Sequence, residues 1–269
     1  MKFENGIQHM LDVDYFSLDR VSQSSLKAFR RSPQHYLHSK TAPFEPTAAM
    51  KLGSNFDAMI FDSSNFRERL SVYPSTFDRR TKESKAWIAA QDPDRILMSE
   101  ADQLELESMK RSLFDNKYAA SLLSEGSAQV AVVADFQGIN GTIGVKGKID
   151  FVPPFSTNCL VDLKTTADAS PKVFGKKVFD LGYHIQAAFY LDLYANFATR
   201  REAFVLLAVE TSAPYLTVVY NLSAEAIELG RRIYTEDLNR MIDCIQSGVW
   251  GGYSEEVVQI EVPVYLQKL

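Results

Sequence analysis

The sequence predicts an α/β fold in which helices flank a mixed central sheet and a helical N-terminal part packs on that core. Up to about residue 125 the apolar residues recur mainly at helical spacing, whereas after residue 127 short apolar runs alternate with turn residues and helices. The hydrophobic share is 46% and the charged share 23%, which is ordinary for a globular protein and excludes disordered, collagen-like and coiled-coil chains.

The N-terminal part is expected to be mainly helical. Serine caps precede its first amphipathic run, and its last run is long and strongly periodic. The Tyr73-Pro74 pair and the Asp92-Pro93-Asp94 run mark loops. The expected helices cover residues 22–31, 48–61, 82–90 and 100–123.

The second part alternates strands with helices. An Asn-Gly pair in the turn at residues 138–141 indicates a hairpin, and a proline-containing loop at residues 153–158 separates the next two strands. The expected strands cover residues 129–136, 142–152, 159–165, 203–209, 215–221 and 257–262. The expected helices cover residues 182–197 and 223–247, and Ser223 caps the second.

One domain is expected over residues 1–269, with a mainly helical part at 1–126 and a core at 127–269, because no linker rich in Pro, Gly or Ser divides the chain. No signal peptide or apolar run of about 18 residues is present, which predicts a cytoplasmic protein without a membrane partner. Cys159 and Cys244 are expected to be free buried thiols. The net charge of −5 argues against a general nucleic-acid coat protein but allows a DNA enzyme with acidic metal ligands.

The chemistry is expected at residues 148–164. Asp162 and Lys164 are two residues apart, so on a strand they share one face. If this strand and the preceding one form an antiparallel pair about a midpoint near Ser156, Asp150 falls opposite Asp162. Directly opposite Cβ atoms lie about 4.5–5.5 Å apart, so the two carboxylates would face one another beside a lysine.

Two carboxylates at that spacing repel one another, and a divalent cation removes the conflict. Mg²⁺, or Mn²⁺, prefers oxygen ligands and binds substrate phosphate, which points to metal-assisted phosphodiester hydrolysis with Lys164 assisting the attacking water. The alternative reading of Asp162 and Lys164 is an ordinary salt bridge at a strand edge, because an Asp-x-Lys triplet recurs by chance.

The following helix places Tyr183, Gln186 and Tyr190 on one face at spacings i, i+3 and i+7. Their polar groups can hydrogen-bond a phosphate or nucleotide beside the metal site. The alternative is that both tyrosines belong to the core and that Gln186 is a surface residue. His184 is interpreted as a packing or capping residue.

Three runs in this region carry a resemblance to a known family. They are VKGKIDFVPP, VDLKTTADAS and YHIQAAFYLDLY, and the N-terminal runs SQSSLKAFRRSPQHYL, LGSNFDAMIFDSSNF and RRTKESKAW extend the similarity over nearly the whole chain. The sequence resembles the nuclease domain of RecE-type exonucleases (exodeoxyribonuclease VIII), within the PD-(D/E)xK superfamily and its RecB-like nucleases. This resemblance implies a restriction-endonuclease-like core.

The resemblance also implies roles for individual residues. Asp150 and Asp162 match the metal-binding acids, the Leu163 backbone carbonyl is a possible further ligand, Lys164 is the motif lysine, and Gln186 and Tyr190 match a Gln-x-x-x-Tyr element. The implied activity is degradation of linear double-stranded DNA from an end, 5′ to 3′, by a ring-shaped homo-oligomer. The remaining 3′ strand would pass to a single-strand annealing protein, in a phage or prophage setting.

Two positions depart from this pattern. Asp57 stands where the family commonly has a metal-ligating His, and Gln129 is the nearest match to a Glu before the first core strand. Asp57 still offers oxygen ligands, but a neutral amide coordinates a cation poorly. If both changes weaken the metal site, the alternative is a DNA-end-binding recombination scaffold with little or no hydrolysis. A structure-specific endonuclease is a further alternative.

Two basic clusters are candidates for contact with duplex phosphate. One contains Arg79, Arg80, Lys82 and Lys85 near Trp87, and the other contains Lys172, Lys176 and Lys177. The alternative for each is an ordinary solvated surface. No glycine-rich phosphate loop is present, so ATP use is not expected.

Overall fold

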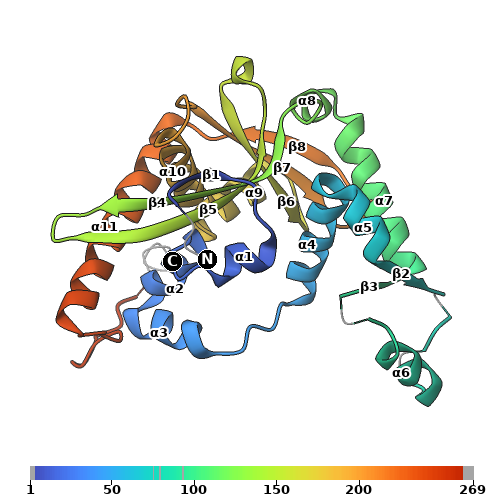
Figure 1. Cartoon of the computed structure of the whole chain (residues 1–269), viewed down its shortest axis with the longest axis horizontal. Coiled ribbons are helices and arrows are strands. Elements are labelled where there is room, and N and C mark those ends of the chain that lie inside the picture. The colour runs from blue at the N-terminus through green and yellow to red at the C-terminus, as the bar shows by residue number, and fades with distance from the viewer. Residues whose placement is uncertain (1–3, 75, 79, 93, 263–269) are drawn as a thin grey trace.

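The fold was obtained as a computed structural model, which describes residues 4–262 except residues 75, 79 and 93. A six-stranded sheet crosses the molecule in the order β1-β4-β5-β6-β7-β8 (Figure 1). Its strands are β1 (Gly6–Gln8), β4 (Ser127–Gln137), β5 (Thr142–Val152), β6 (Cys159–Thr166), β7 (Ala203–Glu210) and β8 (Thr217–Asn221).

The sheet is mixed, as the sequence predicts. Its neighbouring strands are antiparallel except for β6 and β7, which run parallel along their whole length. A parallel pair needs a crossover connection. Here the crossover is made by the helices α9 (Pro171–Asp180) and α10 (Tyr183–Ala195), so both helices lie between β6 and β7 in the chain.

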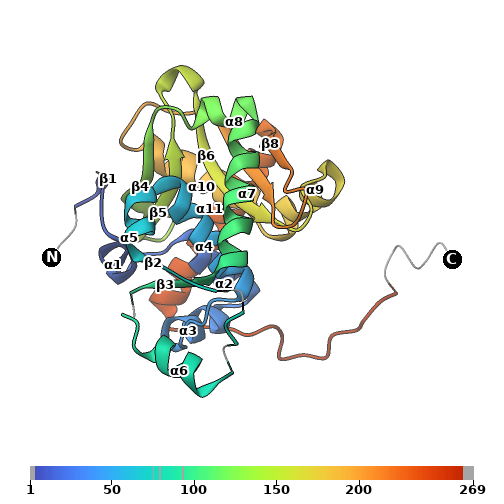
Figure 2. The same ribbon diagram turned by 90° about the vertical axis from the view of Figure 1, so that its right-hand side faces the viewer.

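Helices cover both faces of the sheet and bury two apolar clusters (Figures 1 and 2). One cluster joins the sheet to α2, α10 and α11, and the other joins it to α4, α7 and α8. Apart from α9 and α10, the helices are α1 (Asp12–Ser17), α2 (Gln23–Arg31), α3 (Pro33–Thr41), α4 (Ala48–Phe61), α5 (Ser63–Arg69), α6 (Lys82–Ala89), α7 (Glu100–Asp115), α8 (Lys117–Leu122) and α11 (Ala224–Ser247), with the 3₁₀ turn η1 (Phe155–Thr157).

A close helix crossing holds α10 in place. A Cβ atom built on Gly230 of α11 would lie 2.2 Å from the backbone oxygen of His184, near the start of α10. No side chain fits there, so glycine allows the two helices to touch through their backbones. Arg231, the next residue of α11, binds Asp192 of α10 through two nitrogens at 2.6 and 2.8 Å.

The hairpin of β4 and β5 forms as predicted. The turn joins Gln137 to Thr142, and the Gly138 N–H donates to the Gly141 carbonyl at 2.8 Å. On the opposite side of the molecule from the tip of this hairpin, β2 (Leu70–Tyr73), α6 and β3 (Ile96–Ser99) form a projection in which β2 and β3 pair as a separate parallel ribbon (Figure 1).

Two expected elements are wrong. The helix expected at residues 100–123 ends at Asp115, because the Asn116 side chain accepts from the Tyr118 and Ala119 N–H groups and caps a new helix, α8. The strand expected at residues 257–262 is not a strand; this apolar segment is exposed and extends away from the body (Figure 2). The sequence reading also missed β1, α1, α3, α5, α9, β2 and β3.

Both cysteines are free, with Cys159 buried and Cys244 half-buried. Over the described residues, no helix is both long enough and apolar enough to cross a membrane.

Candidate active site

The candidate site lies where β5 and β6 separate. The two strands pair at Phe151 and Val161, which places Asp150 opposite Asp162, the register predicted from the sequence. Beyond this point the Leu163 N–H donates to Oδ2 of Asp150 at 2.9 Å. The Asp150 carboxylate therefore accepts a hydrogen bond from the backbone of the neighbouring strand, and both acids lie at the opening between the strands.

Asp162 is the most enclosed acid of the site, with only 1% of its surface exposed. Its Oδ1 accepts a hydrogen bond of 2.8 Å from Nε2 of Gln186 on α10. Its Oδ2 is buried and accepts no hydrogen bond from the part of the chain that is described, but it contacts the ammonium of Lys164. Burial raises the pKa of Asp162, while Lys164 opposes that rise.

Lys164 remains a cation in these surroundings. Burial alone would lower its pKa, but Asp162 and Asp150 outweigh burial and raise it. Its Nζ also lies 4.8 Å from the centre of the Tyr183 ring, within the range of a cation–π contact. A protonated Lys164 can stabilise negative charge or donate a hydrogen bond, but it cannot accept a proton from water.

Tyr190 lies one helical turn after Gln186 and is buried. Burial raises the pKa of its hydroxyl, and the charges of Asp162 and Asp150 raise it further, so the hydroxyl stays protonated. With Tyr183 and Gln186 it forms the predicted polar stripe on one face of α10. The structure thus places the predicted stripe against the acids, with Gln186 acting on Asp162 directly.

Asp57 reaches the same site from α4. The helix crosses β6 closely, since a Cβ atom on Gly53 would lie 3.4 Å from Oγ1 of Thr165. Burial raises the pKa of Asp57 to about 7, with Lys164 and Lys148 opposing the rise and Asp162 adding to it. The charge of Asp57 in turn raises the pKa of Asp150.

These residues fit a divalent cation. Asp57, Asp150 and Asp162 offer carboxylate oxygens, and burial raises the pKa of each. Among the described residues, the buried Oδ2 of Asp162 has only the Lys164 ammonium as a partner. A cation would offset this cost, and oxygen ligands favour Mg²⁺ or Mn²⁺. Among the described side chains, no three His, Cys, Asp or Glu residues already converge as a closed ligand set, so the carboxylates would supply only part of the coordination.

The sequence matches a protein family over residues 22–262, described as a PDDEXK-like domain of unknown function (DUF3799). The chain belongs to this family. The match confirms the predicted PD-(D/E)xK resemblance and the fold class. No curated protein matches the sequence.

A solved structure shares the fold of this PDDEXK-like domain, and a second one aligns with it only weakly. A protein of Eubacterium rectale described as a candidate exonuclease aligns with a TM-score of 0.67 at 15% identity, covering 97% of this chain and 98% of the other. A phage-related exonuclease of Haemophilus somnus 129PT aligns with a TM-score of 0.35 at 14% identity, covering 88% of this chain and 99% of the other. The first similarity supports the fold, and the second is too weak to carry an argument.

The predicted DNA-binding residues of the PDDEXK-like domain are spread over two elements. Arg79 lies outside the described residues; Arg80 and Lys82 lie on the β2-α6-β3 projection, where Arg80 is 90% exposed and pairs with Asp78 at 3.1 Å. Lys172 and Lys176 are exposed on α9, which follows β6. None of these four belongs to the elements that carry the acids. Their contact with DNA stays a prediction.

The structure also gives the positions of Gln129, Leu163 and His184. Gln129 occupies the register position opposite Asp150, in a break of the β4–β5 ladder, with a left-handed φ of 52° that is uncommon outside glycine. The N–H of Leu163 binds Asp150, while a ligand role for its carbonyl stays a prediction. His184 is a packing residue, since it is buried and its ring centre lies 4.9 Å from that of Phe179.

The sequence reading missed Lys148 as a site residue. It stands two residues before Asp150 on the same strand, and its ammonium contacts Asp12 of α1. The signal was the period-two spacing of Lys148 and Asp150, which places both on one strand face. Asp12 could not be found in this way, because the two residues are far apart in the chain.

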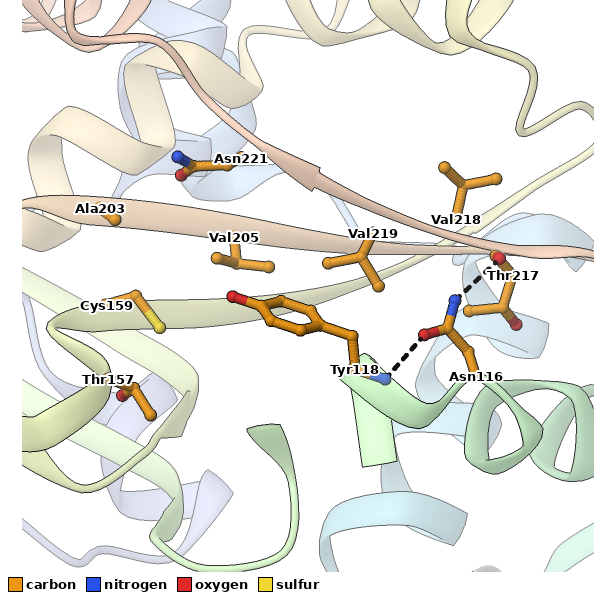
Figure 3. A pocket seen from close by; sticks show the side chains of 10 residues that line it. All are labelled: Asn116, Tyr118, Thr157, Cys159, Ala203, Val205, Thr217, Val218, Val219 and Asn221. Carbon is orange, nitrogen blue, oxygen red and sulfur yellow. Dashed lines mark hydrogen bonds between the residues drawn. The ribbon is translucent and has the colours of Figure 1, made fainter. Parts of the chain in front are cut away.

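A cavity of about 440 Å³ opens away from these acids, between α8 and the sheet (Figure 3). In Figure 3 the Tyr118 ring reaches over β6 and β7, and Asn116 bonds to Thr217 on β8. The lining has amide, hydroxyl, thiol and apolar groups but no carboxylate, histidine or lysine. We therefore assign the chemistry to the opening between β5 and β6.

Proposed function

We propose that this protein is a metal-dependent exodeoxyribonuclease that degrades linear double-stranded DNA from its ends. The observation that carries the proposal is the position of Asp150 opposite Asp162 at a strand opening, with Lys164 and Gln186 bound to Asp162. Membership in the PDDEXK-like family and the shared fold of the Eubacterium rectale protein, described as a candidate exonuclease, support it.

The side chains of the site have separate tasks in this proposal. Asp150 and Asp162, with Asp57, would hold Mg²⁺ or Mn²⁺, which when bound neutralises charge on the scissile phosphate. Lys164, held protonated by its acidic neighbours, donates to the attacking water or to the phosphate. Gln186 fixes the orientation of the Asp162 carboxylate. Tyr190 supplies a protonated hydroxyl to the same network.

The finer parts of the proposal rest on the resemblance to RecE-type exonucleases. They are 5′ to 3′ polarity, a ring-shaped homo-oligomer around the DNA, and transfer of the 3′ strand to a single-strand annealing protein in a phage or prophage setting. In this proposal the exposed lysines of α9 would contact duplex phosphate. The position of α9 in the chain, directly after the strand that carries Asp162 and Lys164, supports this part.

The first experiment incubates the protein with end-labelled linear duplex and with covalently closed circular DNA, in Mg²⁺ or Mn²⁺. Wild-type protein should degrade only the linear DNA, and the order of label release reports polarity. Asp162→Asn and Lys164→Ala should stop hydrolysis. Cleavage of the closed circle would instead indicate an endonuclease. Full activity of Asp162→Asn would refute the assigned site.

A second candidate is a DNA-end-binding scaffold with little hydrolysis. One observation favours it: the position opposite Asp150 holds Gln129, whose neutral amide coordinates a cation poorly. End binding without cleavage in either metal would support this candidate. Gln129→Glu and Asp57→His are then the substitutions that should increase cleavage.

A further inference from the structure

Two lysines on one face of β5 hold α1 against the site in different ways. Lys146 and Lys148 lie two residues apart on β5, the strand that also carries Asp150, and α1 lies across them. The following segment continues along β5, where Val21 forms a bridge to Val145. The N-terminal segment therefore borders the active site.

The ammonium of Lys146 binds backbone carbonyls of the N-terminal segment. Its buried ammonium donates to the carbonyls of Tyr15 at 2.7 Å and Leu18 at 2.8 Å, at the C-terminal end of α1. It also lies 4.8 Å from the centre of the Tyr15 ring. A cation at this end of a helix satisfies carbonyls that have no partner within the helix. Lys146 thus anchors α1 through a buried ammonium.

Lys148 has a different partner. Its ammonium contacts Oδ1 of Asp12, in the first turn of α1, and this acid keeps 69% of its side chain exposed whereas Lys148 keeps 18%. Lys148 also belongs to the acidic site, because its charge lowers the pKa of Asp57. A partly enclosed cation that acts on Asp57 is thus paired with a carboxylate from α1, a helix of six residues.

The end of α1 that carries Asp12 is weakly held. No side chain caps its N-terminus, and Val13 and Phe16 point to solvent. Exposed ion pairs contribute about 0–1 kcal/mol, so an incoming anion can replace Asp12 at little cost. The Lys146 contacts at the other end would keep α1 attached during this exchange.

We infer that Lys148 binds a backbone phosphate of the DNA substrate. Until DNA binds, Asp12 forms an ion pair with the Lys148 ammonium. The inference rests on the proposed function and adds a substrate-binding residue to it. The exchange replaces one oxygen anion by another on the same donor, so the lysine is never left without a partner. Asp12 therefore competes with DNA for this position.

The test measures binding of a short fluorescent duplex to the full chain, in chelator without divalent metal, so that no hydrolysis is needed. Lys148→Met should weaken binding about tenfold, equally for different sequences. It should also lower the salt slope by about one counterion. Asp12→Asn should tighten binding about threefold. This gain should vanish in the Asp12→Asn/Lys148→Met double variant.

Asp19→Asn is the matched control, because it removes an exposed acid of the same segment that pairs with Lys40 at 3.0 Å. It should leave affinity closer to wild type than Asp12→Asn does. Thermal melting reports the fold of each variant, and Lys148→Arg should keep binding. If Lys148→Met does not fold, Asp12→Asn still tests the inference with every lysine present.

The outcomes separate the two proposals. Wild-type binding that Lys148→Met does not weaken overturns this inference and leaves the nuclease proposal standing. A gain from Asp12→Asn that persists without Lys148 also overturns it, because the effect would then be one of net charge. Absence of duplex binding by the wild-type protein overturns the inference together with the proposed function.

Discussion

Gln186 donates a hydrogen bond of 2.8 Å to Oδ1 of Asp162, which links the crossover helix α10 to the central strand β6. The bond orients a carboxylate whose other oxygen is buried beside Lys164. Groups that orient metal ligands affect affinity and activity strongly even when they never touch the metal. Gln186 is accordingly a positioning residue, and its substitution should lower hydrolysis without unfolding the chain.

Gln186→Met should lower hydrolysis about 10–100-fold. Raising the Mn²⁺ concentration should recover part of that loss, because the substitution loosens the carboxylate without removing it. Gln103→Met is the control: it removes another amide-to-carboxylate bond of 2.8 Å, to Glu107, on the exposed face of α7. Equal activity of both variants would contradict the positioning role.

Asp57→Asn should make the chain more stable in the presence of a chelator, but metal should stabilise the variant less than the wild type. Burial and the charge of Asp162 both disfavour its ionised form, so removing the charge should raise the free energy of unfolding by about 1 kcal/mol. Mn²⁺ should raise the melting temperature of the wild type more than that of the variant. Asp62→Asn, at the exposed end of the same helix, should keep the wild-type response.

The stability of the chain should fall on acidification through His184. Burial lowers the pKa of His184, and Arg30 lowers it further. Between its unfolded pKa of about 6.5 and its lower folded pKa, only the unfolded chain binds the proton, so the free energy of unfolding decreases as pH falls. The loss is about 1.4 kcal/mol for each pH unit in that window.

Urea unfolding at pH 8 and pH 5.5 measures this effect. His184→Gln should show a smaller decrease between the two pH values than the wild type. Equal decreases would show that His184 does not contribute to the acid sensitivity.

Gly230→Ala should destabilise the chain by about 1–3 kcal/mol, because the added methyl would meet the His184 carbonyl at 2.2 Å and push α10 from α11. Gly175→Ala is the matched control on α9, where nothing lies within 4 Å of an added Cβ. It should stabilise by about 0.5–1 kcal/mol. Chemical denaturation compares the two, and a neutral Gly230→Ala would contradict the crossing.

Local patterns predicted much of the fold. Period-two spacing placed Asp162 and Lys164 on one face, and the length of the loop placed Asp150 opposite Asp162. Besides the elements that were missed, two expected elements were wrong. The apolar pattern at residues 100–123 continues through Asn116, whose capping side chain starts a second helix. The apolar run at residues 257–262 forms no strand, although its composition favours one.

The sequence by itself determined the mixed α/β core, the paired acids and the polar stripe of α10, because spacing along a strand or helix dictates which side chains share a face. Only the tertiary structure decided that Asp57 reaches those acids, that Gln186 binds Asp162 and that Asp12 meets Lys148. These contacts join residues up to 136 positions apart. Their formation depends on how helices pack across the sheet, which no local pattern encodes.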